Sequence, residues 1–474
     1  MTTTVWHGFQ AAWEMARGYE GQFGHKLNAP YVFLPLCALF LVGLLDWRRP
    51  WRVANLDLFV LLGFGISHIY FNRGEIGVSV PLQYPPLLYL FGRALWIGFR
   101  GRGEGIRPVW PATWLLIAAL FLVGFRVGLN VADSGAIDVG YAGVVGADRI
   151  AHGEPLYGNF PDDVSQGDTY GPVNYYAYVP FERIWPWSGS WDDLPAAHAA
   201  AVFFDLATFA LLILLGMRIR PGPAGRKLAA TLAFGWAAYP YTAFALQSNS
   251  NDTLVAMLLV ATLLVLARPA ARGATLALAT FTKFAPALLA PMLATYRPRV
   301  LSTPPAERRR WWTGIGPSVR ASALFLVAFA GVSALGMLWP AIDPGLSTFW
   351  ERTIAYQADR DSPFSIWGQT SLEPLRIAIL IGVGALAVLL AFRPRRKSLV
   401  QVAALGAALL IGLQLTAQHW FYLYIVWFYP LLLVAITCLG ERAPSPARSS
   451  RPVLRRSPRR RLPSPRRPPR PSRT

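Results

Sequence analysis

Long apolar stretches recur along the chain, and they restrict its fold more than any other feature of the sequence. Most of them approach the ~20 residues that a helix needs to cross a bilayer. Hydrophobic residues make up 54% and charged residues 15% of the 474 residues, whereas soluble domains carry about 25% charged residues. The sequence therefore predicts an all-α, polytopic transmembrane helical bundle. The apolar stretches are 31–45, 112–127, 196–217, 254–267, 321–338, 377–392, 399–415 and 421–439.

The positions of lysine and arginine predict how the chain crosses the membrane. Basic residues collect in cytoplasmic loops, and here they cluster near Arg48, Arg100, Arg218, Arg268 and in the loops around 300 and 395. If every cluster is cytoplasmic, the N-terminus is external and about eleven spans alternate between the two sides. The predicted spans are 31–47, 54–71, 86–99, 111–130, 196–217, 228–246, 252–267, 319–339, 374–392, 399–417 and 421–439.

One apolar segment, 273–296, does not fit a single crossing because basic clusters lie at both of its ends. We expect it to form a re-entrant hairpin that enters and leaves from the cytoplasmic side. Lys283 and Pro286 lie where the bend of this hairpin is expected. Non-helical backbone at membrane depth is tolerated where protein buries it or where it lines a cavity.

The charge pattern also divides the chain into regions. We expect a multi-pass protein of the plasma membrane, inserted without a cleavable secretory signal. Cys37 and Cys438 both lie in apolar stretches, which predicts neither a disulfide framework nor a metal cluster. The regions are an external N-terminal segment (1–30), a four-span region (31–130), an external loop of catalytic type (131–195), a C-terminal membrane region (196–440) with an external loop at 341–373, and a cytoplasmic tail (441–474).

The tail carries twelve arginines against one acid, Glu441, and many prolines. A like-charged, proline-dense segment cannot bury a core, so we expect it to be disordered. Contact with anionic membrane lipids suits its charge, although a solvated tail that only fixes the topology explains it equally well. Nucleic-acid binding is not expected, because no folded recognition module accompanies the arginines.

The loop at 131–195 has the opposite charge to the cytoplasmic loops. It holds ten acidic residues and only two arginines, Arg149 and Arg183. A helix expected at 136–151 places Asp138, Tyr141 and Asp148 or Arg149 on one side. Asp138 is the first candidate for a catalytic base, with Asp133 as an alternative, while Asp148 and Arg149 are interpreted as a supporting pair. A partly solvated interfacial helix is the competing interpretation.

Further candidates come from polar or aromatic residues near the ends of the spans. Tyr170 lies in an aromatic stretch suited either to anchoring at the lipid–water boundary or to stacking on a sugar. Gln247, Asn251 and Asp252 begin a span and either cap its helix or bind a substrate. Lys283 is interpreted as functional or as snorkelling, whereas the place of Arg126 near the outer end of a span favours snorkelling.

The later external loops supply cationic candidates. Arg352 and Arg360 carry guanidinium groups suited to bidentate phosphate binding, although exposed ion pairs also explain them. His419 lies just outside the last span, as a fixed hydrogen-bonding group or a ligand for an anion. The sequence has no Walker motif, no helical HExxH and no GxSxG in a strand–turn–helix context, which argues against an ATP-driven pump.

In order along the chain, these motifs resemble those of the multi-spanning GT-C glycosyltransferases. The resemblance covers about 120–435 and is greatest to the actinobacterial polyprenyl-phosphate-mannose-dependent α-mannosyltransferases. The matching strings are Asp138 with Tyr141, Gly153 to Tyr157, Tyr170-Gly171-Pro172, Gln247 to Asn249, Thr282 to Pro286, and His419. Four spans precede the catalytic-type loop here, whereas members of the family commonly have one.

The resemblance implies a membrane hexosyltransferase that moves a sugar, mannose in the related branch, from a polyprenyl-phosphate donor to a lipid or glycan acceptor at the extracytoplasmic face. Asp138 or Asp133 would be the base, and the other residues named would bind substrate. The sequence indicates no cofactor, specifies no metal ligand and leaves a divalent metal open. A secondary transporter, a lipid flippase and a non-catalytic membrane scaffold are the alternatives.

Overall fold

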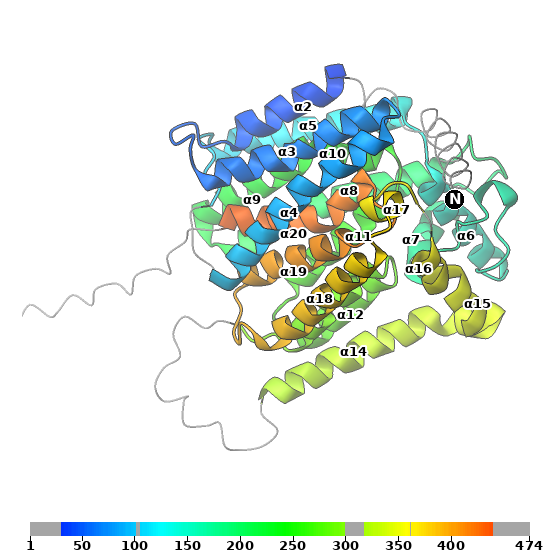
Figure 1. Ribbon diagram of the computed structural model, residues 1–474. Coiled ribbons are helices and arrows are strands. Elements are labelled where there is room, and N and C mark those ends of the chain that lie inside the picture. Colours follow the sequence, from blue (N-terminus) through cyan, green and yellow to red (C-terminus); the bar gives the residue numbers. More distant parts are fainter. Residues whose placement is uncertain (1–29, 101–104, 299–316, 361, 439–474) are drawn as a thin grey trace, which may run out of the picture. The chain divides into compact units, whose positions relative to one another are not determined.

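The computed structural model describes residues 30–100, 105–298, 317–360 and 362–438. These residues form helices and one isolated β-bridge, between Pro298 and Lys397, which confirms the predicted all-α fold. The N-terminal segment, part of the basic loop near residue 300 and the tail predicted to be disordered lie outside the described residues. Figure 1 shows the helices in chain order.

The first half of the chain supplies the outer helices and the loop that was predicted to carry the catalytic acid. The long helix α4 begins ten residues earlier than the predicted span at 86–99 and includes three internal prolines. The elements are α2 (Pro30–Leu44), α3 (Val53–Asn72), α4 (Ile76–Arg100), α5 (Ala112–Asp133), α6 (Asp138–His152), η1 (Asp162–Val164), α7 (Pro172–Glu182), α8 (Pro195–Ile219), α9 (Gly222–Ala238) and α10 (Pro240–Gln247).

The second half contains the hairpin, the second loop region and the central helices. The predicted loop at 341–373 is built from short helical turns. The elements are α11 (Asp252–Leu264), α12 (Pro269–Thr280), η2 (Ala285–Leu289), α13 (Ala290–Ala294), α14 (Pro317–Pro340), η4 (Ala341–Gly345), α15 (Leu346–Trp350), η5 (Glu351–Ala355), α16 (Tyr356–Asp359), α17 (Ile366–Gln369), α18 (Glu373–Phe392), α19 (Leu399–Gln414), η6 (Tyr422–Tyr424) and α20 (Ile425–Cys438).

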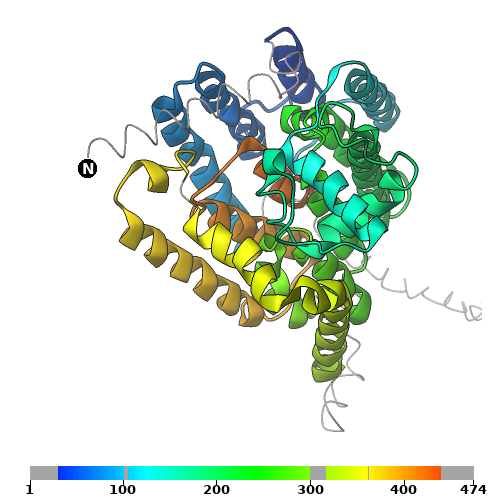
Figure 2. The same cartoon turned by 90° about the vertical axis from the view of Figure 1, so that its right-hand side faces the viewer.

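Helix length and burial distinguish outer from central helices, and they identify a membrane protein. The helical stretch that contains α14 is poorly buried, with 11% of its most apolar part covered by other residues, and the corresponding share for α18 is 17%. Helix α14 lies at the edge of the bundle in both views (Figures 1 and 2). By contrast, α19 and α20 are shorter and almost wholly buried. Five helical stretches of the described part are long and apolar enough to cross a bilayer: Val53–Asn72, Ala112–Asp133, Pro195–Ile219, Ser318–Ala358 and Glu373–Phe392.

The segment at 273–296 forms the predicted hairpin. Helix α12 ends at Thr280, the chain turns through Lys283, and η2 and α13 return. The guanidinium carbon of Arg272, near the start of α12, lies 5.2 Å from the ring centroid of Tyr296, beyond the end of α13. Both ends of the hairpin therefore lie together, and its bend lies at the opposite end of the bundle.

Pro240 interrupts the span that the sequence predicts at 228–246. Proline has no N–H, so the carbonyl of Trp236 loses its helical partner, and Tyr239 is held in an extended conformation. The hydroxyl of Thr242 donates to this carbonyl at 2.6 Å, and Nη1 of Arg126 donates to it at 3.3 Å. Side chains therefore satisfy a backbone group that would otherwise be unpaired in the membrane interior.

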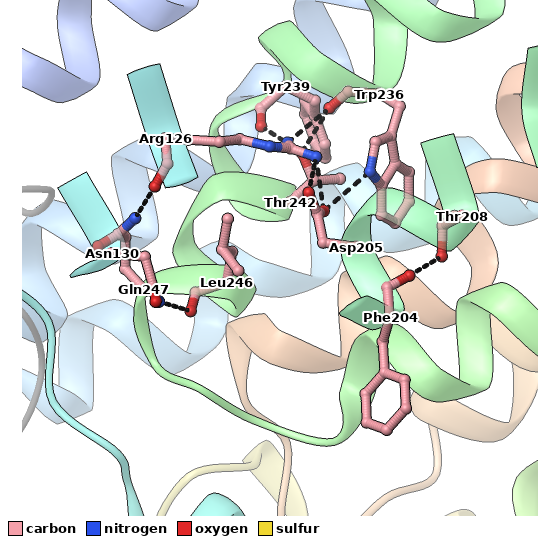
Figure 3. Close-up of polar contacts among 10 residues, drawn as sticks. All are labelled: Arg126, Asn130, Phe204, Asp205, Thr208, Trp236, Tyr239, Thr242, Leu246 and Gln247. Atoms are coloured by element: carbon pink, nitrogen blue, oxygen red, sulfur yellow. Dashed lines mark hydrogen bonds and ion pairs between the residues drawn. The ribbon is translucent and has the colours of Figure 1, made fainter. Parts of the chain in front are cut away.

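The expectation that Arg126 snorkels to the surface is wrong. Its side chain is buried, and Nη2 donates to both carboxylate oxygens of Asp205 on α8, with 2.5 Å to Oδ1 (Figure 3). Trp236 donates its Nε1 to Oδ1 at 3.0 Å. Snorkelling is unnecessary because the carboxylate on the next helix neutralises the charge inside the bundle.

Removal of the Arg126 guanidinium should destabilise the protein. The Arg126→Leu variant leaves Asp205 as a buried carboxylate without its cation and removes one of the two donors to the Trp236 carbonyl, so we expect the free energy of unfolding to fall by about 3 kcal/mol. Unfolding in mixed detergent micelles measures this change.

The matched control is Arg218→Leu at the exposed end of α8, the helix that carries Asp205, which should leave the stability unchanged. The double variant Arg126→Leu, Asp205→Leu removes both charges and should recover part of the loss. A single variant as stable as the control would contradict a stabilising role for the pair.

Candidate functional site

One cavity lies where the acidic loop, the hairpin bend and the last loop meet, at the end of the bundle that Figure 2 views directly. We call it the Asp138 cavity; its empty space, including the part open to solvent, is about 520 Å³. It brings together five of the residues that the sequence singled out as site residues: Asp138, Tyr170, Lys283, Arg360 and His419. Its full lining is Phe71, Ile137, Asp138, Val139, Tyr170, Asp252, Lys283, Arg360, Phe364, His419, Phe421, Leu423 and Tyr424.

Asp138 is the first residue of α6, and close backbone packing holds it in place. The N–H of Ile137 donates to the carbonyl of Ser248 at 3.2 Å. A Cβ atom on Gly140 would lie 2.2 Å from the carbonyl oxygen of Asn249, so only glycine allows α6 to approach this loop so closely. The loop at 246–252 therefore fixes the start of α6 and the carboxylate it carries.

The Asp138 carboxylate is partly buried and lines the cavity. Its Oδ1 accepts a hydrogen bond from the N–H of Val139 at 2.9 Å. Burial raises the pKa of Asp138, while this hydrogen bond and the positive charges of Arg360 and Lys283 oppose the rise. Such a carboxylate holds a proton more readily than an exposed aspartate, which suits a group that takes a proton from substrate.

Lys283 lies at the hairpin bend and is buried rather than snorkelling. Its Nζ lies 2.6 Å from Oδ1 of Asp252, the first residue of α11, and Nε1 of Trp427 donates to the same oxygen at 2.7 Å. The ring centroids of Tyr170, Tyr424 and Trp427 lie 5.2, 5.5 and 5.1 Å from Nζ. A carboxylate and three aromatic faces thus hold the ammonium group in the cavity wall.

The turn that carries Tyr170 packs directly against the hairpin. A Cβ atom on Gly171 would lie 2.1 Å from the carbonyl oxygen of Phe281, and the N–H of Val173 donates to this same oxygen at 3.0 Å. Only glycine permits this contact. The Tyr170-Gly171-Pro172 turn, which the sequence analysis singled out, therefore delivers the Tyr170 ring to Lys283.

Arg360 and His419 complete the polar lining of the cavity. Nδ1 of His419 lies 2.9 Å from the Ser362 hydroxyl, and the ring of Phe364 packs edge-on against the imidazole at 5.4 Å. Burial lowers the pKa of His419 well below its usual value, and the charges of Arg360 and Lys283 lower it further. The imidazole is therefore neutral near pH 7 and can hydrogen-bond without adding a charge.

A second cavity, of about 1110 Å³, adjoins the first, and we call it the Arg376 cavity. The two share Tyr170, Lys283, His419 and Tyr424 in their linings. Arg376 and Leu380 of the poorly buried helix α18 line the second cavity only. Its other residues are Thr169, Phe284, Ala285, Ile354, Gln357, Leu413, Gln414, Thr416, Ala417, Gln418 and Trp427.

Six of the predicted site residues line neither cavity. Asp133, the alternative base, ends α5 with an exposed side chain. Tyr141 follows Asp138 by three residues on α6 but does not line the cavity, because its ring is buried against Trp191 at 4.7 Å and its hydroxyl donates to Asp163 at 3.2 Å. The aromatic segment that follows α7 covers this side of α6 and draws the tyrosine into the core.

Arg149 and Asp148 do not form the expected supporting pair. Arg149 pairs with Glu154 at 3.4 Å and donates to the Asn159 carbonyl, whereas Asp148 lies 3.2 Å from His152. Adjacent residues diverge around a helix, so each finds its partner on a different side.

The remaining three of these six predicted site residues, Gln247, Asn251 and Arg352, make internal contacts. Gln247 donates to the carbonyl of Arg126 at 2.8 Å, and Asn251 donates to Oδ1 of Asn174 at 2.7 Å. Arg352 makes a bidentate contact with Asp168, at 2.7 Å from Nε and 2.8 Å from Nη2. This pairing joins the loop at 341–373 to the loop at 131–195, so Arg352 supports the site from outside the cavities.

The sequence did not identify Tyr424, Trp427 and Arg376 as site residues, although all three line a cavity. It left the role of Asp252 open. Tyr424 and Trp427 are one helical turn apart and stack at 4.4 Å, a spacing that the sequence displays but that an apolar span also explains. Arg376 pairs with Glu373, at 2.7 Å between Nε and Oε2, which resembles an ordinary surface pair. The described residues contain no group of three or more histidine, cysteine, aspartate or glutamate side chains suited to a metal ion.

Comparison with known proteins gives a likeness at the level of structure, not of sequence. No family model and no curated protein sequence matches the chain. Among solved structures, the chain is similar to ArnT from Cupriavidus metallidurans, whose crystal structure was determined with undecaprenyl phosphate bound, at 16% sequence identity and a TM-score of 0.45. The match covers 69% of this chain and 59% of that neighbour, so the chain spans less than two thirds of the length of ArnT.

Proposed function

We propose that this protein is a membrane glycosyltransferase that moves a hexose, mannose in the first instance, from a polyprenyl-phosphate donor to a lipid or glycan acceptor on the extracytoplasmic side. The observation that carries the proposal is the convergence of Asp138, Lys283, Arg360 and His419 on one cavity, beside a larger one bordered by α18. The order of motifs that resembles the GT-C glycosyltransferases supports the same assignment.

In this proposal the two cavities take the two substrates. The polyprenyl chain enters beside the lipid-facing helix α18, and the donor phosphate reaches the wall that both cavities share. The acceptor occupies the Asp138 cavity. The sugar then crosses from one cavity to the other at Lys283 and Tyr170, which line both.

The reaction needs a base and a set of groups that stabilise a leaving phosphate. Asp138 takes the proton of the acceptor hydroxyl while the hydroxyl oxygen bonds to the anomeric carbon. The bond from the anomeric carbon to the phosphate oxygen breaks, and its electron pair stays on the phosphate. Lys283 and Arg360 stabilise that charge, and neutral His419 contributes a hydrogen bond.

The transporter alternative requires charged groups along a path through the bundle. The structure does contain two buried pairs within spans, Asp57 with Arg93 at 2.9 Å and Arg126 with Asp205, which the sequence analysis did not anticipate. In each pair the two opposite charges neutralise each other, as expected for structural ion pairs. The charged groups that line the Asp138 and Arg376 cavities collect at one end of the bundle, which favours a surface reaction over transport.

A direct assay tests the proposal. Purified protein should transfer label from radiolabelled polyprenyl-phosphate mannose to components of a membrane lipid extract. Donors carrying other hexoses, assayed in parallel, identify the sugar. If no donor yields a labelled product, the protein is not a transferase of this class.

The Asp138→Asn variant should lower transfer at least ~10²-fold, because the amide cannot accept the acceptor proton. The variant retains the size of the side chain, so its melting temperature should match the wild type. Initial rates at saturating donor measure the effect. Asp133→Asn is the matched control and should retain full activity; the reverse result would assign the base to Asp133.

The pH profile should show an acid limb from Asp138. Transfer requires the ionised carboxylate, and burial raises its pKa, so activity falls with decreasing pH at a higher midpoint than the ~3.9 of an exposed aspartate. Arg360→Gln removes a charge that favours ionisation and should move the midpoint of kcat/KM upward by about 1 pH unit. Arg360→Lys, which keeps the charge, should leave the midpoint near that of wild type, and equal midpoints in all three proteins would contradict the coupling.

A further inference from the structure

Three phenylalanine rings from separate segments form part of the lining of the Asp138 cavity. Phe71 lies near the end of α3, Phe364 precedes α17, and Phe421 precedes η6. The ring centroid of Phe71 lies 5.7 Å from that of Phe364 and 5.4 Å from that of Phe421. Phe71 therefore joins the other two rings, and we call the three together the phenylalanine wall.

The phenylalanine wall shares its cavity with strongly polar groups: the Asp138 carboxylate, the Arg360 guanidinium and the His419 imidazole. A pyranose ring matches this mixture, because it has hydroxyl groups around its edge and an apolar face of C–H groups. The wall removes the C–H face from water, and the polar groups bond the hydroxyls. An acyl chain would instead leave the charged groups desolvated and without partners.

The helices around the two cavities indicate which cavity suits a lipid ligand and which suits a sugar. Helix α18, which is poorly buried, contributes Arg376 and Leu380 to the Arg376 cavity. The lining of the Asp138 cavity includes no residue of α14 or α18, the two most lipid-exposed helices among the described residues. Its walls come from the acidic loop, the start of α11, the hairpin bend, the loop at 341–373, the turn before α20 and the end of α3.

We propose that the phenylalanine wall is the acceptor subsite and that the hydroxyl attacking the donor belongs to a pyranose ring. This inference rests on the proposed function, and it makes Phe71 a specificity-determining residue. Helix α3 belongs to the four-span region that precedes the acidic loop. That region thus selects the acceptor, in addition to packing against the rest of the bundle.

Phe71→Leu tests the proposal, because it keeps an apolar side chain but removes the ring face. We expect the KM for a methyl mannoside or methyl glucoside acceptor to rise roughly tenfold. The KM for the donor and the rate of donor hydrolysis without acceptor should stay within about twofold of wild type. Phe71→Tyr, which keeps the ring, should retain the wild-type KM for the acceptor.

The matched control is Phe59→Leu, the same substitution at an exposed position of the same helix, and its kinetics should equal those of wild type. Preference for a long-chain alcohol or diacylglycerol acceptor, with a KM that Phe71→Leu does not change, would overturn the proposal. So would a donor KM that rises together with the acceptor KM, since the wall would then hold the sugar of the donor.

Saturation-transfer NMR with methyl mannoside and methyl glucoside separates this proposal from the proposed function, because it needs no turnover. Saturation should pass from the protein to the C–H protons of one sugar face, and the signal should fall in Phe71→Leu but not in Phe59→Leu. A signal without transfer from any donor would refute the transferase assignment and support the sugar subsite. The subsite would be overturned if Phe71→Leu gave the same signal as the wild type. It would also be overturned if the wild type gave no signal.

Discussion

The contact between Lys283 and Asp252 is the constraint on which the arrangement of the site depends. It joins the bend of the hairpin to the first residue of α11, and Trp427 ties the same carboxylate to α20. An ammonium group at this depth is costly unless it is paired, so the pair fixes how far the hairpin inserts. Lys283 lines both cavities, together with His419 and two of the rings that surround the ammonium group, Tyr170 and Tyr424.

The bilayer imposes the same requirement elsewhere in the bundle. Pro240 deprives the Trp236 carbonyl of its helical partner, and Arg126 and Thr242 replace that partner, while Asp205 neutralises Arg126. Near the opposite end, Asp57 accepts from Arg93 and from the Tyr89 hydroxyl. In both places the charged groups are paired with groups on another helix. This internal pairing lets the interior helices carry charges without forming a path through the bundle.

Several elements could be predicted from the sequence because the deciding information is local. The spans follow from runs of apolar residues, and the hairpin follows from basic residues on both sides of one run. The placement of Asp138, Tyr170 and His419 near one end of the bundle follows from the topology, whereas the sequence did not place Lys283 with them. Two of the residues whose contacts differ from expectation have partners that are distant in sequence. Asp205 is 79 positions from Arg126, and the partner of Arg352, Asp168, is 184 positions away.

The sequence by itself determined the all-helical membrane fold, the order of its spans and the loops that carry its polar residues, because hydrophobicity and charge act residue by residue. The tertiary structure alone decided which polar residues face a cavity and which pair with one another. In the folded protein Tyr141 is buried and Arg352 pairs with Asp168. Asp252 lies beside Lys283, and Phe71 of α3 lines the Asp138 cavity. These outcomes depend on close contacts between segments far apart in the chain, and the periodicity of a single helix carries no information about such contacts.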